Sequence, residues 1–159
     1  MKIHYLKGDA TVPIMRPAII PHICNDEGGW GAGFVLALSR KWKEPEKAYR
    51  LWHRGLGQTT IEQPFELGKS QIVRVENDIT VANMIAQHGL GIRNGMIPLR
   101  YDALRKCLSN VYSSLYEGET VHMPRIGCGL AGGDWGEVEK ILTDVITVDT
   151  YVYDYKEGS

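Results

Sequence analysis

The stretch VHMPRIGCGLAGGDWGEVEKIL, residues 121–142, decides the fold class of this chain. It opens with an apolar run over residues 121–124 that is typical of a short buried strand. A glycine-rich segment, Gly127–Gly133, follows directly. Beyond it, apolar residues recur at helical spacing: Trp135, Val138, Leu142 and Val145. Strand, glycine-rich turn and helix in immediate succession indicate an α/β domain.

A second strand–loop–helix unit lies nearer the N-terminus. Residues 18–24, AIIPHIC, predict a buried strand, in which Pro21 indicates an edge position or a bulge because proline has no amide hydrogen. The glycine-rich segment Asn25–Gly33 comes next. A helix is expected after it, because the apolar residues Phe34, Leu38 and Trp42 recur at helical spacing.

Both glycine-rich loops lie where a strand is followed by a helix, which is where open α/β sheets bind ligands. Glycines let the backbone approach a ligand closely, and a helix N-terminus adds partial positive charge. One such loop often serves only tight packing, but two, with eight glycines between them, favour a diphosphate held from both sides. Neither loop has the Walker pattern, because no Gly-Lys-Ser/Thr follows either of them.

The rest of the chain supplies the remaining elements. Further strands are expected over residues 3–6, 72–75, 79–86 and 150–153, and residues 87–95 are loop-like. Further helices are expected over residues 44–55 and around Leu104, Leu108, Val111 and Leu115. We therefore expect one domain over residues 1–159, with helices on both faces of a mostly parallel or mixed sheet, a three-layer α/β/α fold.

Composition narrows the classes of function. The formal net charge is −1, with 43% apolar and 23% charged residues, which is ordinary for a globular domain and argues against general nucleic-acid or membrane-surface binding. The three cysteines are far apart, without a CxxC pair, so neither a disulfide framework nor a metal site is expected. No signal peptide or membrane span is recognisable, and we expect a cytoplasmic protein without a cofactor.

Three motifs carry a resemblance to a known family. They are Gly8-Asp9, then HICN (22–25) leading to GWGAGF (29–34), and then MPRIGCGL (123–130). Their order and spacing resemble those of a macro domain over nearly the whole chain. The branch that fits best holds the terminal ADP-ribose glycohydrolase and the ADP-ribose-1″-phosphate phosphatase. The resemblance implies a three-layer fold that binds ADP-ribose, a derivative of it, or an ADP-ribosylated protein.

The resemblance also implies roles for individual residues. Asp9 would accept from the adenine amino group, and Tyr153 would pack near the adenine. The loop Gly31–Gly33 would wrap the distal ribose and the diphosphate, and Gly127–Gly133 would cradle the diphosphate. The implied ligand-binding residues are Asp9, Asn25, Gly31, Ala32, Gly33, Gly127, Cys128, Gly129, Leu130, Ala131, Gly132, Gly133 and Tyr153.

Five of the candidate site residues also have a purely structural interpretation. Asp9 can be a turn former, and Tyr153 can be ordinary sheet packing. Asn25 either caps its turn or bonds the distal ribose. Cys128 lies between two glycines, which favours selection for small size over a reactive thiol. His22 is either a hydrogen-bonded core residue or, by its match to a histidine of the phosphatase branch, a catalytic one.

Asp134 is the other candidate catalytic residue. Asp134 and Glu137 have the spacing of a capping box, which would explain the aspartate by itself. Asp134 is also the only carboxylate of the second loop. The glycohydrolase branch uses a lysine where this chain has Ala86 or Gln87, and an aspartate where it has Ala131. A covalent lysyl intermediate is therefore not available at that site.

Three functions remain open on the sequence. One is hydrolysis of an ADP-ribose derivative (1″-phosphate, O-acyl or protein-linked), with Asp134 or His22 steering a water or protonating the leaving group. The second is a non-catalytic reader of ADP-ribose, which needs the pocket only. The third is an unrelated nucleotide-phosphate enzyme of the same layered architecture.

Overall fold

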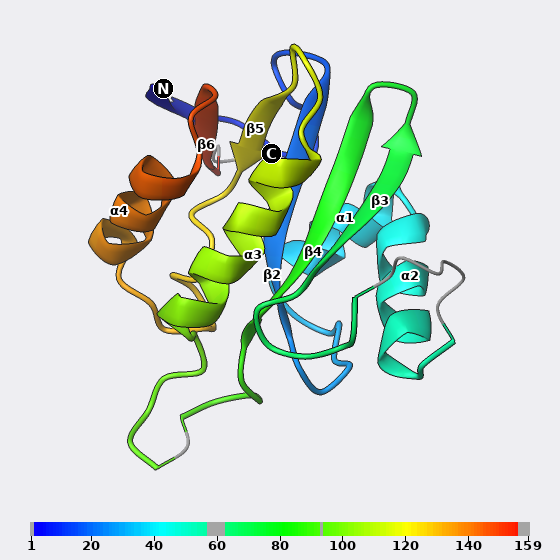
Figure 1. Cartoon of the computed structure of the whole chain (residues 1–159), viewed down its shortest axis with the longest axis vertical. Helices are drawn as coiled ribbons and strands as arrows, with labels where there is room; N and C mark the ends of the chain where they lie inside the picture. Colours follow the sequence, from blue (N-terminus) through cyan, green and yellow to red (C-terminus); the bar gives the residue numbers. More distant parts are fainter. Residues whose placement is uncertain (1, 57–62, 93, 156–159) are drawn as a thin grey trace.

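The structure, a computed structural model, describes residues 2–56, 63–92 and 94–155. Six strands form one sheet in the order β1-β6-β5-β2-β4-β3 (Figure 1). The strands are β1 Ile3–Lys7, β2 Ala18–Asn25, β3 Ser70–Glu76, β4 Ile79–Gln87, β5 Thr120–Met123 and β6 Thr150–Asp154. Neighbouring strands run parallel, except that β3 and β4 form an antiparallel pair. The expected mixed sheet is confirmed.

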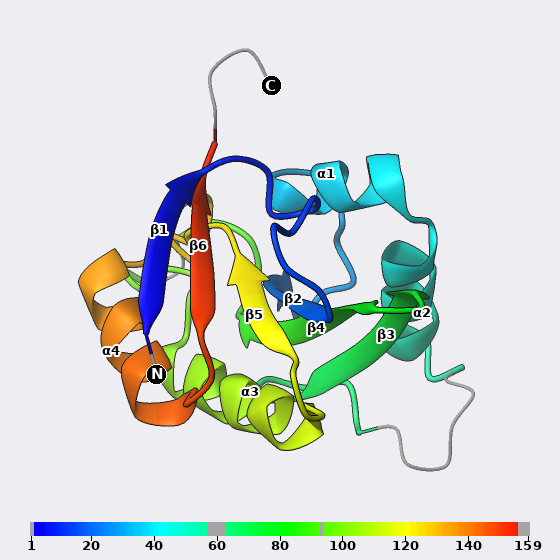
Figure 2. The same cartoon turned by 90° about the horizontal axis from the view of Figure 1, so that it is seen from above.

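Four helices cover the two faces of this sheet. They are α1 Phe34–Lys41, α2 Glu44–His53, α3 Tyr101–Ser114 and α4 Trp135–Val145. Helices α3 and α4 lie on one face, and α1 and α2 lie on the other (Figure 2). The core divides in the same way: Leu104 and Leu142 pack with Val121 in one buried cluster, and Leu38 packs with Val81 in another. This confirms the three-layer α/β/α fold.

The position of Pro21 corrects one expectation. Strand β2 is an interior strand, between β5 and β4, and not an edge. The irregularity in its pairing with β4 falls between Cys24 and Asn25, so it is not at the proline either. Pairing with β5 is confined to Ala18 and Ile19, which leaves that side of β2 unpaired from there onward. A residue without an amide hydrogen is tolerated because that ladder has already ended.

The parallel direction of β2, β4 and β5 brings their carboxyl ends to the same edge of the sheet. Each end is followed by an irregular segment, and two of these segments are the glycine-rich loops. This edge is therefore where a ligand site is expected. No helix in the described part of the chain is both long and apolar enough to cross a membrane.

Candidate functional site

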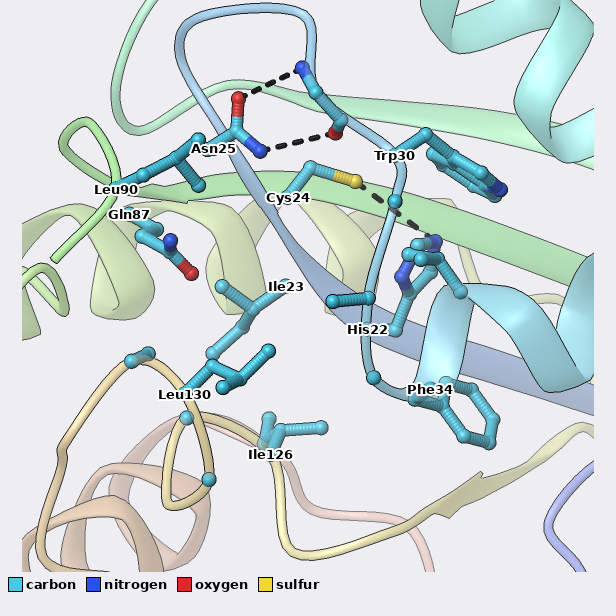
Figure 3. Close-up of a pocket in the computed structure, with 18 of the residues that line it drawn as sticks. His22, Ile23, Cys24, Asn25, Trp30, Phe34, Gln87, Leu90, Ile126 and Leu130 are labelled. Atoms are coloured by element: carbon cyan, nitrogen blue, oxygen red, sulfur yellow. Dashed lines mark hydrogen bonds between the residues drawn. The ribbon is translucent and has the colours of Figure 1, made fainter.

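A cavity of about 540 Å³ lies between the two glycine-rich loops at this edge (Figure 3). Its volume is in the range of small-molecule and cofactor sites. The residues expected at the ligand that line it are His22, Asn25, Gly31, Ala32, Gly33, Gly127, Gly129, Leu130 and Ala131. The expected residues outside its lining are Asp9, Cys128, Gly132, Gly133, Asp134 and Tyr153. The structure thus brings both loops together around one space.

The first loop is held in shape by the side chain of Asn25. Its Oδ1 accepts from the backbone amides of Glu27 and Gly29, at 2.9 and 3.0 Å, and its Nδ2 donates to the Gly29 carbonyl at 2.9 Å. The buried Tyr49 hydroxyl donates to the Asn25 carbonyl at 2.5 Å. The structure therefore supports the turn-capping interpretation of Asn25, and a bond to the distal ribose stays a prediction.

The N-terminus of α1 opens onto the cavity. Gly33 precedes the helix with a φ of 84°, in the left-handed region that favours glycine, and Phe34 and Val35 line the cavity. No side chain of the described residues caps this helix. The Leu36 amide donates to the Gly33 carbonyl at 3.1 Å, but the amides before it have no carbonyl partner within the helix and are available to an anion in the cavity.

The second loop is partly a packing element and partly open. A Cβ on Gly133 would lie 2.3 Å from Leu99 Cδ2 and 2.6 Å from the Gly127 carbonyl oxygen, so this glycine is required for close packing. A Cβ on Gly129 would meet no atom of the described residues within 4 Å. Leu130 is 72% exposed, and its Cδ1 would lie 3.7 Å from a Cβ on Gly33. Leu130 therefore reaches across to the first loop.

The two residues expected at the adenine lie near the carboxyl ends of β1 and β6. Asp9 Oδ1 accepts from the backbone amide and the hydroxyl of Thr11, at 2.9 and 2.8 Å, which is the geometry of a turn. Tyr153 is buried, and its hydroxyl accepts from the Ile14 amide at 3.1 Å and lies 2.6 Å from His122 Nδ1. The structural interpretations of both residues are supported. Contact with adenine stays a prediction.

His22 is fixed in the core of β2. Its Nε2 lies 2.5 Å from Asn83 Oδ1, and Asn83 Nδ2 donates to Pro45 O and Gln71 Oε1 at 3.1 and 3.0 Å. These two bonds fix the orientation of the Asn83 amide, so the atom that faces His22 is the oxygen. An amide oxygen can only accept, and Nε2 of the histidine therefore carries the hydrogen. Nδ1 has no hydrogen-bond partner within the described residues. Burial lowers the pKa of His22 to about 4, so the ring is neutral at neutral pH, and its catalytic role stays a prediction.

Asp134 is the N-cap of α4, as the sequence indicates. Its Oδ2 accepts from the Glu137 amide at 3.2 Å. The reciprocal half of the expected capping box is wrong: the Asp134 amide donates to the Tyr101 hydroxyl at 2.9 Å, and Glu137 lies 3.6 Å from Lys140 Nζ. The tyrosine from α3 therefore replaces the glutamate. Asp134 is exposed, and its catalytic role stays a prediction.

Cys128 has surroundings that agree with a packing residue. Its sulfur donates to the Ile126 carbonyl at 3.4 Å. Burial, and then the nearby carboxylate of Asp134, raise the pKa of the Cys128 thiol above its ordinary value. A raised pKa keeps a thiol protonated and unreactive.

The lining of the cavity is poor in groups that exchange protons. No aspartate, glutamate or lysine of the described residues lines it. Arg125, the one arginine among the described residues of the lining, bonds both carboxylate oxygens of Asp154, at 2.7 and 3.1 Å. Burial raises the pKa of Cys24 well above the ordinary value, so this thiol is also neutral. Among the described residues, no group of three or more His, Cys, Asp or Glu side chains is placed to hold a metal ion.

One polar pair near this cavity was not predicted from the sequence. His88 Nδ1 lies 2.7 Å from Asp26 Oδ2. The nearby Gln87 and Leu90 line the cavity (Figure 3). The two residues are 62 positions apart in the chain. An aspartate beside Asn25 and a histidine at the end of a strand were visible, but only the register of β2 with β4 brings them together.

Comparison with known proteins decides the family. No family model matches the chain. A solved structure described as a macrodomain protein from Streptomyces coelicolor is 46% identical, with a TM-score of 0.81, over 98% of this chain and 100% of that one. The chain belongs to the macrodomain family. The expectation drawn from the three motifs is confirmed.

Two curated relatives of this macrodomain are more distant. The ADP-ribose 1″-phosphate phosphatase of Lodderomyces elongisporus is 22% identical, over 96% of this chain and 98% of its own length. The chromodomain-helicase-DNA-binding protein 1-like of Danio rerio is 29% identical over 99% of this chain. The macrodomain spans only 16% of that relative's length.

Proposed function

We propose that this macrodomain binds ADP-ribose in the cavity between its two glycine-rich loops and hydrolyses a derivative of it. The observation that carries the proposal is the placement of both loops and an uncapped helix N-terminus around one space of about 540 Å³. Backbone amides on both sides of the cavity suit a diphosphate, which needs many donors and positive potential. The similarity to an ADP-ribose 1″-phosphate phosphatase over nearly its whole length supports the same ligand.

We propose that the ligand lies along the sheet edge, with its adenine toward Asp9 and Tyr153. The diphosphate would then lie between the N-terminus of α1 and Gly129. The distal ribose would point toward Asn25 and Gln87, the last residues of β2 and β4, both of which line the cavity. A group on the distal ribose, whether phosphate, acyl or protein, would leave at that end.

The reaction we propose is hydrolytic release of this group. The loop amides would stabilise developing charge on oxygen, and the assignment of the general acid or base to Asp134 or His22 stays a prediction from the sequence. An ADP-ribosylated protein is one of the substrates that this arrangement would admit. We also propose that residues 1–159 form a single macrodomain of the cytoplasm. The three cysteines, all free, fit a reducing compartment.

One observation favours a second candidate function, a reader that binds ADP-ribose without turning it over. No carboxylate or lysine of the described residues lines the cavity, so the lining itself is better suited to binding than to proton transfer. The two functions differ in a single outcome, which is release of product.

The experiment that separates them is incubation of the protein with ADP-ribose 1″-phosphate, O-acetyl-ADP-ribose and an ADP-ribosylated protein. We expect at least one of them to yield free ADP-ribose at a rate proportional to the enzyme concentration. The matched control is the Gly31→Glu variant, in which the new side chain would enter the cavity while a Cβ at this position lies within 4 Å of no other described atom. Tight ADP-ribose binding with no turnover of all three would replace the hydrolase with the reader.

A further inference from the structure

The pair of Asp26 and His88 adjoins residues that line the end of the cavity assigned above to the distal ribose, and neither of the two is itself in that lining. Asp26 directly follows Asn25, and His88 lies between Gln87 and Leu90. Asn25, Gln87 and Leu90 all line the cavity. Each member of the pair therefore directly follows a residue of the cavity wall, Asp26 just beyond the end of β2 and His88 just beyond the end of β4.

The geometry of the pair is that of an oriented histidine. His88 Nδ1 lies 2.7 Å from Asp26 Oδ2, and Asp26 Oδ1 accepts from the Gly89 amide at 2.8 Å. Both carboxylate oxygens are thus engaged, which fixes the plane of the carboxylate. A carboxylate can only accept, so Nδ1 carries the hydrogen and Nε2 of the neutral ring carries the lone pair.

The backbone holds both residues in place. The Asp26 amide donates to the Gln87 carbonyl at 3.0 Å, and the His88 amide donates to the Pro98 carbonyl at 2.8 Å. The imidazole is 47% exposed, while the Asp26 side chain is 18% exposed. Burial raises the pKa of Asp26, but the bonds from the Gly89 amide and from His88 outweigh it and hold the pKa below the ordinary value. The aspartate is therefore ionised at neutral pH.

The other candidates for proton transfer are engaged elsewhere. His22 gives its Nε2 hydrogen to Asn83 inside the core, and Asp134 Oδ2 accepts from the Glu137 amide as the N-cap of α4. Nε2 of His88 has no hydrogen-bond partner among residues 2–56, 63–92 and 94–155. Of the three, His88 alone combines an orienting carboxylate, an available nitrogen and access to water.

We propose that His88 is the general base and acid of the hydrolysis and that Asp26 is its positioning residue. The proposal rests on the proposed function, because it assigns the proton transfer of that reaction. The arrangement of base and orienting carboxylate is the one that activates nucleophiles in other hydrolases.

The step with ADP-ribose 1″-phosphate balances without a further reactant. Nε2 takes a proton from a water molecule while the water oxygen forms a bond to phosphorus. The bond between phosphorus and the ribose oxygen breaks, and the leaving oxygen takes up the proton from the imidazolium. The products are ADP-ribose and inorganic phosphate, and the histidine returns to its neutral form. Asp26 stays ionised throughout and stabilises the imidazolium.

The test uses His88→Ala and Asp26→Asn in the full chain, with steady-state release of phosphate from ADP-ribose 1″-phosphate as the readout. We expect His88→Ala to lower kcat by about 100-fold or more, the usual contribution of general acid–base catalysis. KM and the calorimetric affinity for ADP-ribose should stay within about two-fold, because no binding contact is removed. Imidazole added to the buffer should restore part of the rate of His88→Ala, which a structural role would not allow.

Asp26→Asn should slow kcat as well, and the double variant should be no slower than His88→Ala alone, since the two residues act as a unit. His53→Gln, at an exposed histidine of α2, is the matched control and should keep the wild-type rate. A His88→Ala protein with wild-type kcat, or one whose loss lies in ADP-ribose affinity and is not rescued by imidazole, overturns the assignment. Wild-type protein that binds ADP-ribose but releases no phosphate overturns the hydrolase itself, and the assignment with it.

Discussion

Polar side chains at the cavity mostly bond to the protein itself. Asn25 closes the first loop on itself, His22 is held by Asn83, and Arg125 is paired with Asp154. This leaves the backbone amides of the loops as the donors that face the cavity. Recognition in this macrodomain is therefore expected to depend on loop shape more than on any single charged side chain.

Asp9 is the residue expected to read the base. Asp9→Ala should weaken ADP-ribose binding by about 1–3 kcal/mol, since the adenine amino donor loses a charged acceptor. It should also reduce the preference for ADP-ribose over the inosine analogue, which lacks that amino group. Because Asp9 Oδ1 also holds Thr11, a Thr11→Val variant is the control for a loosened turn. Unchanged selectivity in Asp9→Ala would remove Asp9 from the adenine site.

Variants at Asp134 distinguish its role as a helix cap from a role in catalysis. Asp134→Asn should leave the free energy of unfolding nearly unchanged, since asparagine caps about as well, whereas Asp134→Ala should lower it by about 1 kcal/mol. Denaturant unfolding measures both values. If Asp134 also has the catalytic role that the sequence predicts, the Asn variant loses most turnover while it keeps its stability and its ADP-ribose affinity. Full activity of the Asn variant limits Asp134 to the cap.

At the scale of elements, the sequence predicted the units but not their neighbours. The two strand–loop–helix units that contain the loops Asn25–Gly33 and Gly127–Gly133 could be predicted, because glycines and apolar periodicity are local signals. The order of the strands in the sheet could not be predicted, since it depends on contacts between segments that are distant in the sequence. For the same reason the sequence missed the Asp26–His88 pair and the Tyr101 hydroxyl at the N-terminus of α4.

The two glycine-rich loops offer a contrast between a ligand glycine and a packing glycine. Gly31→Glu should abolish ADP-ribose binding without a large change in melting temperature, because a Cβ at this position contacts no described atom within 4 Å. Gly133→Ala should instead lower the melting temperature, since its Cβ would lie 2.3 Å from Leu99 Cδ2. Thermal unfolding and calorimetry on both variants check this. Normal binding by Gly31→Glu, or its collapse on mild heating, would contradict the role of the loop.

At the scale of the whole molecule, two buried histidines make the free energy of unfolding depend on pH. Burial lowers the pKa of both His22 and His122 to about 4, below the ordinary 6.5 of the unfolded chain. Between these values the unfolded state binds more protons, so stability is intact above about pH 6.5 and falls as the pH drops toward about 4. Each histidine should contribute up to about 3 kcal/mol to this loss.

Denaturant unfolding at a series of pH values from 7 to 4.5 checks the slope. His122→Gln should flatten it, because glutamine stays neutral throughout the range. An unfolding free energy that does not change between pH 7 and 5 would contradict the burial of two neutral imidazoles.

The central proposal for the whole molecule is that the cavity between the two loops is a site for ADP-ribose. Isothermal titration calorimetry of the wild-type protein with ADP-ribose, alongside ATP and NAD, tests this most directly. We predict one site with a dissociation constant in the micromolar range, about −8 kcal/mol, and weaker binding of the other two nucleotides. No heat and no thermal shift with ADP-ribose, together with tight binding of ATP or NAD, would contradict it.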